Sequence, residues 1–219
     1  VIWPANGVML AALLQLHRRQ AVWVLIIGFA LNIVSNAYRG DPPEFLALNA
    51  GMNLLQVLVA AFLARRLCGA ALDMRRPVRL FRFAVGAALP AVALTSLISL
   101  AVATSVRDYA PDQARFLLTR LFSMELLGLL IVTPSLLLIA RGHRFRRDVA
   151  ENPREIVTLS ALVLALTAWA FSQSDAPLLF VVFPPLVLLA FRLSPPWTAG
   201  AVIAISVIGA AATLTGHGP

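Results

Sequence analysis

The side chains best suited to chemistry in this 219-residue sequence are polar groups that interrupt long apolar runs. Asn49, Asn53 and Gln56 recur at positions i, i+4 and i+7 of one run, a spacing that puts their amides on one face of a helix. Amides in apolar helices hydrogen-bond across helix interfaces, or they form the polar wall of a ligand pocket. The spacing is compatible with both interpretations.

A second polar group, formed by Glu125 and Arg120, lies in a later apolar run. A carboxylate surrounded by lipid is expected to be protonated or paired. Arg120 is a poor partner on the same helix, because five residues separate it from Glu125 and the two side chains diverge. We expect a donor from another helix, such as Asn32, Asn36 or Gln56. Glu125 then serves either structural pairing or a functional site.

Three more amides lie in the first two apolar runs. Asn6 follows Pro4 at the start of the first run, where Gly7 allows close backbone approach, and Asn32 and Asn36 are i and i+4 in the second. The candidate residues for binding a ligand or signal are therefore Asn6, Asn32, Asn36, Asn49, Asn53, Gln56, Arg120 and Glu125.

No residue pattern supports catalysis or a metal site. None of His17, His143 and His217 is accompanied by a second His or a Cys at ligand spacing, and no Ser and His form a recognisable nucleophile arrangement. Cys68 is the only cysteine, so a disulfide within the chain is impossible. We predict no catalytic residue and no metal, and the sequence identifies no cofactor.

The elements that must hold these polar groups are membrane-spanning helices. Apolar residues make up 60% of the chain and charged residues 13%, against about a quarter charged in soluble domains. A bilayer core needs a helix of about 20 apolar residues, and the runs lack the alternation of a barrel. We predict an all-α, polytopic transmembrane helical bundle of about eight spans. These are Ile2–Leu16, Ala21–Ala37, Leu46–Ala64, Phe83–Ala103, Phe116–Ala140, Ile156–Phe171, Leu178–Phe191 and Trp197–Thr215.

Arginine placement predicts how these helices are oriented. All 18 basic residues are arginines, and 14 of them lie in alternate gaps between the apolar runs. Short basic loops remain in the cytoplasm, so these gaps, which include Arg75 and Arg146, should be cytoplasmic. Both ends of the chain then lie outside, and we expect a further helix beyond each end. The net charge of +8 is spread over helix ends beside lipid headgroups, which argues against nucleic-acid binding.

Two proline motifs should disturb the helices that contain them. Pro184 and Pro185 lie within the short run Leu178–Phe191, where they should break or kink the helix. Thr133-Pro134 should bend the run that contains Glu125, with the threonine hydroxyl available to a freed carbonyl.

Several segments together resemble a known family, the first type of bacterial membrane-associated sensor domain (MASE). The similar segments are Val1–Gly7 with its Trp-Pro, Asn53 to Arg65-Arg66, Glu125 to Thr133-Pro134, Pro184 to Arg192, and Gly216 to Pro219. The family usually has Asp where Glu125 stands and often Glu where Gln56 stands, which weakens the carry-over of a charged pair. The family's first helix and its last are also missing here.

The resemblance implies that residues 1–219 form a single integral-membrane sensor domain of the bacterial inner membrane. It would detect a small ligand or a membrane or periplasmic partner. It would regulate a cytoplasmic output domain, such as a diguanylate cyclase, a cyclic-di-GMP phosphodiesterase or a histidine kinase. Such proteins work as dimers, and Gly200 and Ala204 offer a small-residue face for a homodimer. The alternative is a small-solute transporter, which the polar stripe and the broken Pro184-Pro185 helix would suit.

Overall fold

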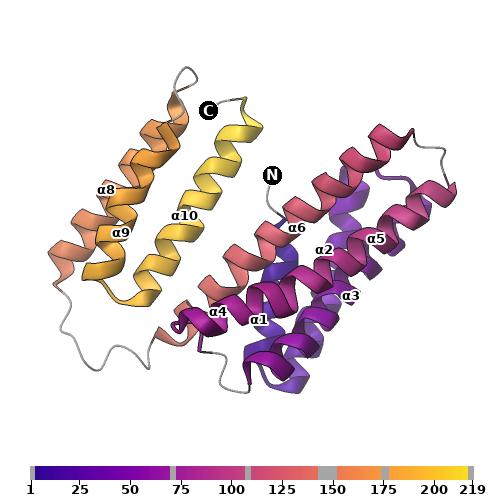
Figure 1. Ribbon diagram of the computed structural model, residues 1–219, viewed down its shortest axis with the longest axis horizontal. Helices are drawn as coiled ribbons and strands as arrows, with labels where there is room; N and C mark the ends of the chain where they lie inside the picture. Colours follow the sequence, from indigo (N-terminus) through magenta and orange to yellow (C-terminus); the bar gives the residue numbers. More distant parts are fainter. Residues whose placement is uncertain (1–2, 70–72, 107–109, 143–151, 174–177, 217–219) are drawn as a thin grey trace. The chain divides into compact units, whose positions relative to one another are not determined.

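The computed structural model describes residues 3–69, 73–106, 110–142, 152–173 and 178–216, and these residues contain helices and no strand (Figure 1). The chain divides into two compact units. We call residues 3–133 the amino-terminal unit, and residues 134–219 belong to the carboxy-terminal unit. The amino-terminal unit holds most of the polar residues considered above.

Prolines begin four of the helices in the amino-terminal unit, because a proline in the first turn lacks only an N–H that would have no partner there. The elements are α1 (Pro4–Gln15), α2 (Arg18–Tyr38), α3 (Pro43–Cys68), α4 (Pro77–Phe83), the π-helical η1 (Ala84–Ala88), α5 (Leu89–Val106) and α6 (Pro111–Ala140). Helix α3 packs against α1, α2, α4, η1 and α5, so it lies at the centre of the unit.

The carboxy-terminal unit is a smaller helical cluster, made of α8 (Pro153–Ser172), the 3-10 turn η2 (Leu178–Val182), α9 (Phe183–Arg192) and α10 (Pro195–Leu214). The side chain of Asn152 caps α8 by accepting a hydrogen bond of 3.1 Å from the backbone N–H of Arg154. Its core consists of Val163 from α8 with Leu189 and Leu193, both fully or nearly fully buried.

Six helical segments in the described part of the chain are long and apolar enough to cross a membrane. They are Arg18–Tyr38, Pro43–Cys68, Pro77–Ser105, Pro111–Ala140, Pro153–Ser172 and Pro195–Leu214. The prediction of a helical membrane bundle is confirmed, whereas the count of about eight spans is too high.

Two expected spans are shorter than predicted. The run Ile2–Leu16 forms α1, which has 12 residues and a length of about 18 Å against about 30 Å for a bilayer core. The run Leu178–Phe191 is divided between η2 and the 10-residue α9. The length of an apolar run therefore gives too long a helix where a proline inside the run fixes the first turn of that helix.

The two proline motifs act in different ways. Pro184 and Pro185 lie in the first turn of α9, where the run changes from the 3-10 turn η2 to an α-helix. The run is therefore divided at this point, as predicted, and the prolines start the helix that follows. Pro134 does lie inside α6, but the hydroxyl of Thr133 donates a 3.1 Å hydrogen bond to the carbonyl of Gly7 in α1. The threonine therefore joins two helices.

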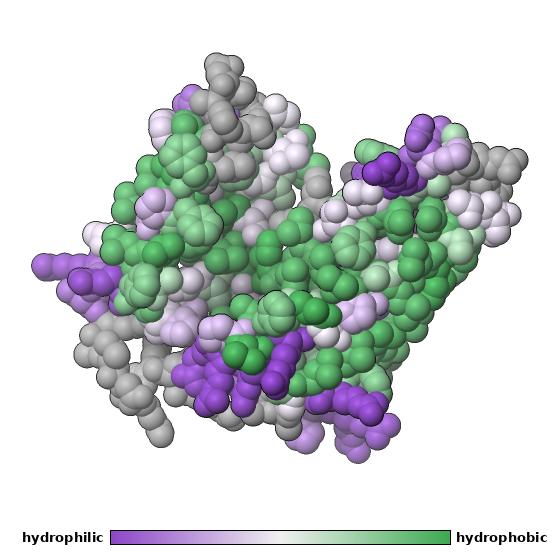
Figure 2. Space-filling view, viewed as in Figure 1, coloured by the Kyte–Doolittle hydropathy of each residue, from purple (hydrophilic) through white to green (hydrophobic). Residues whose placement is uncertain are grey.

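Most arginines of the amino-terminal unit lie at one of its two ends. Arg18 begins α2, Arg65 and Arg66 lie in the last turn of α3, and Arg79 lies in α4. We call this the basic end. The opposite end, where α2 and α5 finish and α3 and α6 begin, we call the outer end. Figure 2 shows hydrophobic residues over the sides of the helices, with hydrophilic residues near helix ends. This distribution is what a membrane-spanning unit requires.

The orientation can be tested with exposed single cysteines at the two ends. In a Cys68→Ala background, Glu44→Cys at the outer end should react with a membrane-impermeant maleimide in intact cells. Arg76→Cys at the basic end should react only after permeabilisation, because the predicted orientation places the arginine-rich end in the cytoplasm. Both positions are exposed, so access depends on the side of the membrane. The reverse labelling pattern would overturn the orientation.

Candidate functional site

A network of buried amides joins helices α1, α2 and α3. The Nδ2 of Asn6 donates to Asn53 Oδ1 at 3.0 Å and to Gln56 Oε1 at 3.2 Å. The Nδ2 of Asn53 donates to Asn32 Oδ1 at 2.8 Å, and Asn32 Nδ2 donates to the carbonyl of Gly28 at 2.9 Å. Each of the four amide side chains is buried, so these bonds form away from water and fix the three helices together.

Helix α5 joins this network through Thr95. Its hydroxyl lies 3.3 Å from Gln56 Oε1, to which it donates, and 3.0 Å from the carbonyl of Ala91 in its own helix. The predicted polar face of α3 therefore meets α1, α2 and α5, and two of its three amides, Asn53 and Gln56, are hydrogen-bonded in the network.

Helix α1 contacts the middle of α6 very closely. The backbone N–H of Trp3 donates to the carbonyl of Met124 at 3.3 Å. A Cβ added at Gly7 would lie 2.7 Å from the carbonyl oxygen of Gly128, and one added at Gly128 would collide with the carbonyl of Trp3. Only glycine permits this approach. The short helix α1 therefore begins beside Met124, well inside the unit, and runs from there to the basic end.

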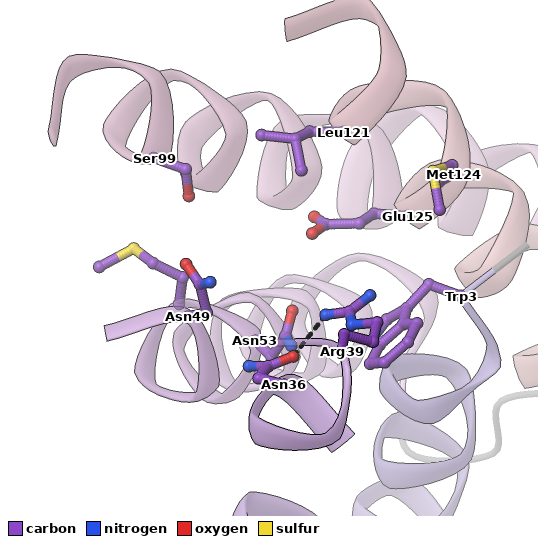
Figure 3. Close-up of a pocket in the computed structure, with 10 residues that line it drawn as sticks. Trp3, Asn36, Arg39, Asn49, Asn53, Ser99, Leu121, Met124 and Glu125 are labelled. Carbon is purple, nitrogen blue, oxygen red and sulfur yellow. Dashed lines mark hydrogen bonds between the residues drawn. The ribbon is translucent and has the colours of Figure 1, made fainter. Parts of the chain in front are cut away.

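A polar cavity lies at the start of α1, and its volume is about 130 Å³ (Figure 3). Helices α2, α3, α5 and α6 supply most of its walls. The lining residues are Trp3, Asn36, Arg39, Asn49, Met52, Asn53, Ser99, Leu121, Met124 and Glu125. The close-up shows the carboxylate of Glu125 pointing into the space between α6 and α3. We call this space the outer cavity.

A second cavity of about 260 Å³ extends this space towards the outer end of the unit. The two cavities share Asn49, Met52, Ser99 and Leu121 in their walls. The second is also lined by Asp41 and Pro42, which lie between α2 and the first turn of α3. A solute would therefore approach the outer cavity from the outer end, between α3, α5 and α6.

The two charged residues of the outer cavity differ in how they are compensated. Arg39 donates from Nη2 to Asn36 Oδ1 at 2.5 Å, lies 3.6 Å from Asp41 Oδ2 and has its guanidinium 4.9 Å from the centre of the Trp3 ring. The carboxylate of Glu125 has neither a hydrogen bond nor an ion pair with any residue that the structure describes. The cavity thus presents a satisfied cation and an unpaired acid.

A hydrogen-bond donor in the same wall is also unused. Asn36 is 1% exposed, and while its Oδ1 accepts from Arg39, its Nδ2 has no partner among the described residues. The indole N–H of Trp3 is buried and unpartnered in the same way. Buried polar groups are normally hydrogen-bonded, so unused groups beside a cavity indicate a place where a ligand or water binds.

The structure separates the eight predicted residues into three sets. Asn6, Asn32 and Gln56 belong to the amide network, Asn36, Asn49 and Glu125 line the outer cavity, and Asn53 does both. Arg120 is exposed on α6 and lines neither the outer cavity nor its extension.

The expected donor to Glu125 is not found. Asn32 and Gln56 bond within the network, and Asn36 shares the cavity with Glu125 without a hydrogen bond between them among the described contacts. The sequence predicts which side chains share one face of a helix. It does not predict which neighbouring helix that face contacts, because this depends on packing. Among the described residues no three His, Cys, Asp or Glu gather as metal ligands, and His143 and His217 lie outside those residues.

Sequence reasoning missed six wall residues, and three of these, Trp3, Arg39 and Ser99, carry an N–H or O–H group that could contact a ligand. Arg39 carried a usable signal, because it follows Asn36 by three residues and so shares its helical face. Ser99 carried none, since a lone serine is ordinary in membrane helices, and Trp3 was noted only as part of the Trp-Pro motif of the family.

Comparison with known proteins gives one match. A sequence model described as MASE1 matches residues 1–219, the whole length of the chain. No curated protein and no solved structure matches the chain.

Proposed function

The chain belongs to the MASE1 family of membrane-associated sensor domains, and on this basis we propose that the outer cavity receives its signal. Domains of this family are sensory and not catalytic, so the chain itself is not an enzyme. The activity that it controls would belong to a cytoplasmic output domain, such as a diguanylate cyclase, a cyclic-di-GMP phosphodiesterase or a histidine kinase. The membrane would be the bacterial inner membrane.

The observation that carries this proposal is a polar cavity within an apolar helical unit. Polar side chains inside a membrane are costly, and they are retained mainly where they bind, pair or conduct. The outer cavity contains an unpaired carboxylate, Glu125, and an unused amide donor on Asn36. Its extension leads to the outer end, where a signal from outside the cytoplasm would arrive.

Helix α1 provides a physical connection from the cavity to the cytoplasmic side. Its first turn lies at the cavity, where Trp3 lines the wall, and near its last turn the carbonyl of Leu13 accepts a 2.6 Å hydrogen bond from Arg65 Nη2 at the basic end. A ligand that fits one position of α1 better than another would shift the populations of the two positions. The displacement would then reach the basic end along a single rigid helix.

A homodimer would be the natural state for such a receptor. Gly200 in α10 has no atom of its own chain within 4 Å of an added Cβ, so its helix face is open. Gly200 and Ala204 lie one turn apart, which is the spacing that permits close approach of two membrane helices. We propose this face of α10 as the contact with a second copy.

The proposal predicts that filling the cavity alters signalling. In the full-length protein, Ser99→Phe should change output activity about fivefold or more, because an aromatic ring in the cavity mimics or excludes the signal and biases the two states. The matched control is Ser105→Phe, on the same helix but exposed and outside both cavities. Output is measured for both variants at equal amounts of membrane-inserted protein.

Unchanged output from Ser99→Phe across growth conditions would contradict a sensory role for the cavity. Reconstituted protein should also take up no solute into liposomes. The transporter alternative still rests on the polar stripe of α3, whereas Pro184 and Pro185 lie at the start of the short α9 and not in the middle of a helix.

A further inference from the structure

We propose that the outer cavity binds a small organic ammonium compound, whose charge is taken by Glu125. This inference rests on the proposed sensory function and names the chemical class of the signal. It follows from the charges, the unused donor and the apolar walls of the cavity.

The balance of charge in the cavity favours a cation. The ionisable residues in the walls of the outer cavity and its extension are Glu125, Arg39 and Asp41, which give two acids and one base. Arg39 is the only cation among the described residues of these walls. Asp41 lies 3.6 Å from it, and Asn36 accepts its 2.5 Å hydrogen bond. The carboxyl group of Glu125 therefore has no cation beside it, and a cationic ligand would stabilise its ionised form.

An anionic ligand is disfavoured by the same geometry. It would have to approach Glu125 while competing for Arg39 with Asp41 and Asn36, which already engage the guanidinium. A like charge close to a carboxylate in a site of low dielectric constant is strongly unfavourable. A cationic ligand would instead find the carboxylate of Glu125 without a partner. Its hydrogen bond to this carboxylate, formed away from water, would contribute substantially to affinity.

The remaining polar groups indicate more than a bare cation. The buried Nδ2 of Asn36 lacks a partner, so the ligand should carry a hydrogen-bond acceptor near its ammonium group. Part of the cavity wall is apolar and would cover the short carbon skeleton of a ligand. This part is formed by Met52, Leu121 and Met124. A small amino alcohol, with an ammonium and a hydroxyl group, has this combination, and ethanolamine is the simplest probe.

The test measures binding to the full-length protein in lipid nanodiscs. The probes are ethanolamine, its neutral counterpart ethylene glycol and its anionic counterpart glycolate, each added at constant ionic strength. We expect saturable binding of ethanolamine by calorimetry, and no saturable binding of the other two. Glu125→Gln keeps the shape of the side chain and removes its charge, so it should weaken ethanolamine binding about tenfold to a hundredfold.

The matched control is Glu155→Gln, because Glu155 lines neither cavity and pairs at 2.6 Å with Arg192 in the carboxy-terminal unit. This variant should bind ethanolamine as the unmodified protein does. Thermal unfolding of both variants shows whether they remain folded.

The binding and output measurements distinguish an error in the ligand class from an error in the sensory role of the cavity. If ethanolamine does not bind, or binds equally to Glu125→Gln, the ligand class is wrong, even where Ser99→Phe alters output. Preferential binding of glycolate would overturn it as well. If ethanolamine binds through Glu125 but Ser99→Phe leaves output unchanged, the ligand class stands and the sensory role of the cavity fails.

Discussion

Gly128→Ala should lower the free energy of unfolding by about 1–3 kcal/mol, because it forces apart the backbones of α1 and α6. The added Cβ would collide with the carbonyl oxygen of Trp3. A backbone atom cannot turn aside as a flexible side chain can, so α1 must shift as a whole. This shift would also strain the hydrogen bond from Trp3 to Met124. Reversible unfolding of the purified protein in mixed micelles measures the effect.

The control for this substitution lies in the same unit. Gly51 in α3 has no atom within 4 Å of an added Cβ, so Gly51→Ala meets open space. Alanine is favoured over glycine within a helix by up to about 1 kcal/mol, and Gly51→Ala should be neutral or stabilising. Equal stability of the two variants would show that α1 does not approach α6 as described.

Asn53→Leu should destabilise the protein by about 1–2 kcal/mol, within the range measured for hydrogen bonds between membrane helices. Asn53 both accepts from Asn6 and donates to Asn32, so its loss leaves two buried groups short of partners. Asn49→Leu is the matched control, one turn away on the same helix. Asn49 has no hydrogen bond with a described residue, so its replacement should change stability by less than about 0.5 kcal/mol.

A double substitution separates the network from simple loss of polarity. If Asn6 and Asn53 interact as the 3.0 Å hydrogen bond indicates, Asn6→Leu combined with Asn53→Leu should cost less than the sum of the two single changes. Strictly additive costs, or equal effects of Asn49→Leu and Asn53→Leu, would contradict the amide network.

These two contacts also bear on signalling, because both hold α1. The Gly128 contact fixes the start of α1, at Trp3, against α6, and Asn6 in its first turn joins it to α3. Because α1 is held firmly at the cavity, a ligand that displaces its first turn would move the whole helix. Variants that loosen α1 should therefore weaken the response to a signal as well as stability, since the two states of a receptor must remain distinct to be selected.

The sequence by itself determined the features that depend on composition and periodicity. The length of apolar runs indicated helices in a membrane, and five segments between Val1 and Pro219 carried the family resemblance that the MASE1 match confirms. The i, i+4, i+7 spacing placed Asn49, Asn53 and Gln56 on one face of α3, and the described contacts of Asn53 and Gln56 agree with that face. These features are local, so neighbouring residues are enough to specify them.

Only the tertiary structure decided which faces meet. It ended α1 after 12 residues, joined Asn6 to Asn53, left Arg120 outside the cavity and brought Trp3 and Arg39 beside Glu125. Helical periodicity specifies the direction of a side chain relative to its own axis, but not the rotation and depth of the neighbouring helix. Those are fixed by close packing at positions such as Gly7 and Gly128, where the absence of a side chain lets two backbones touch.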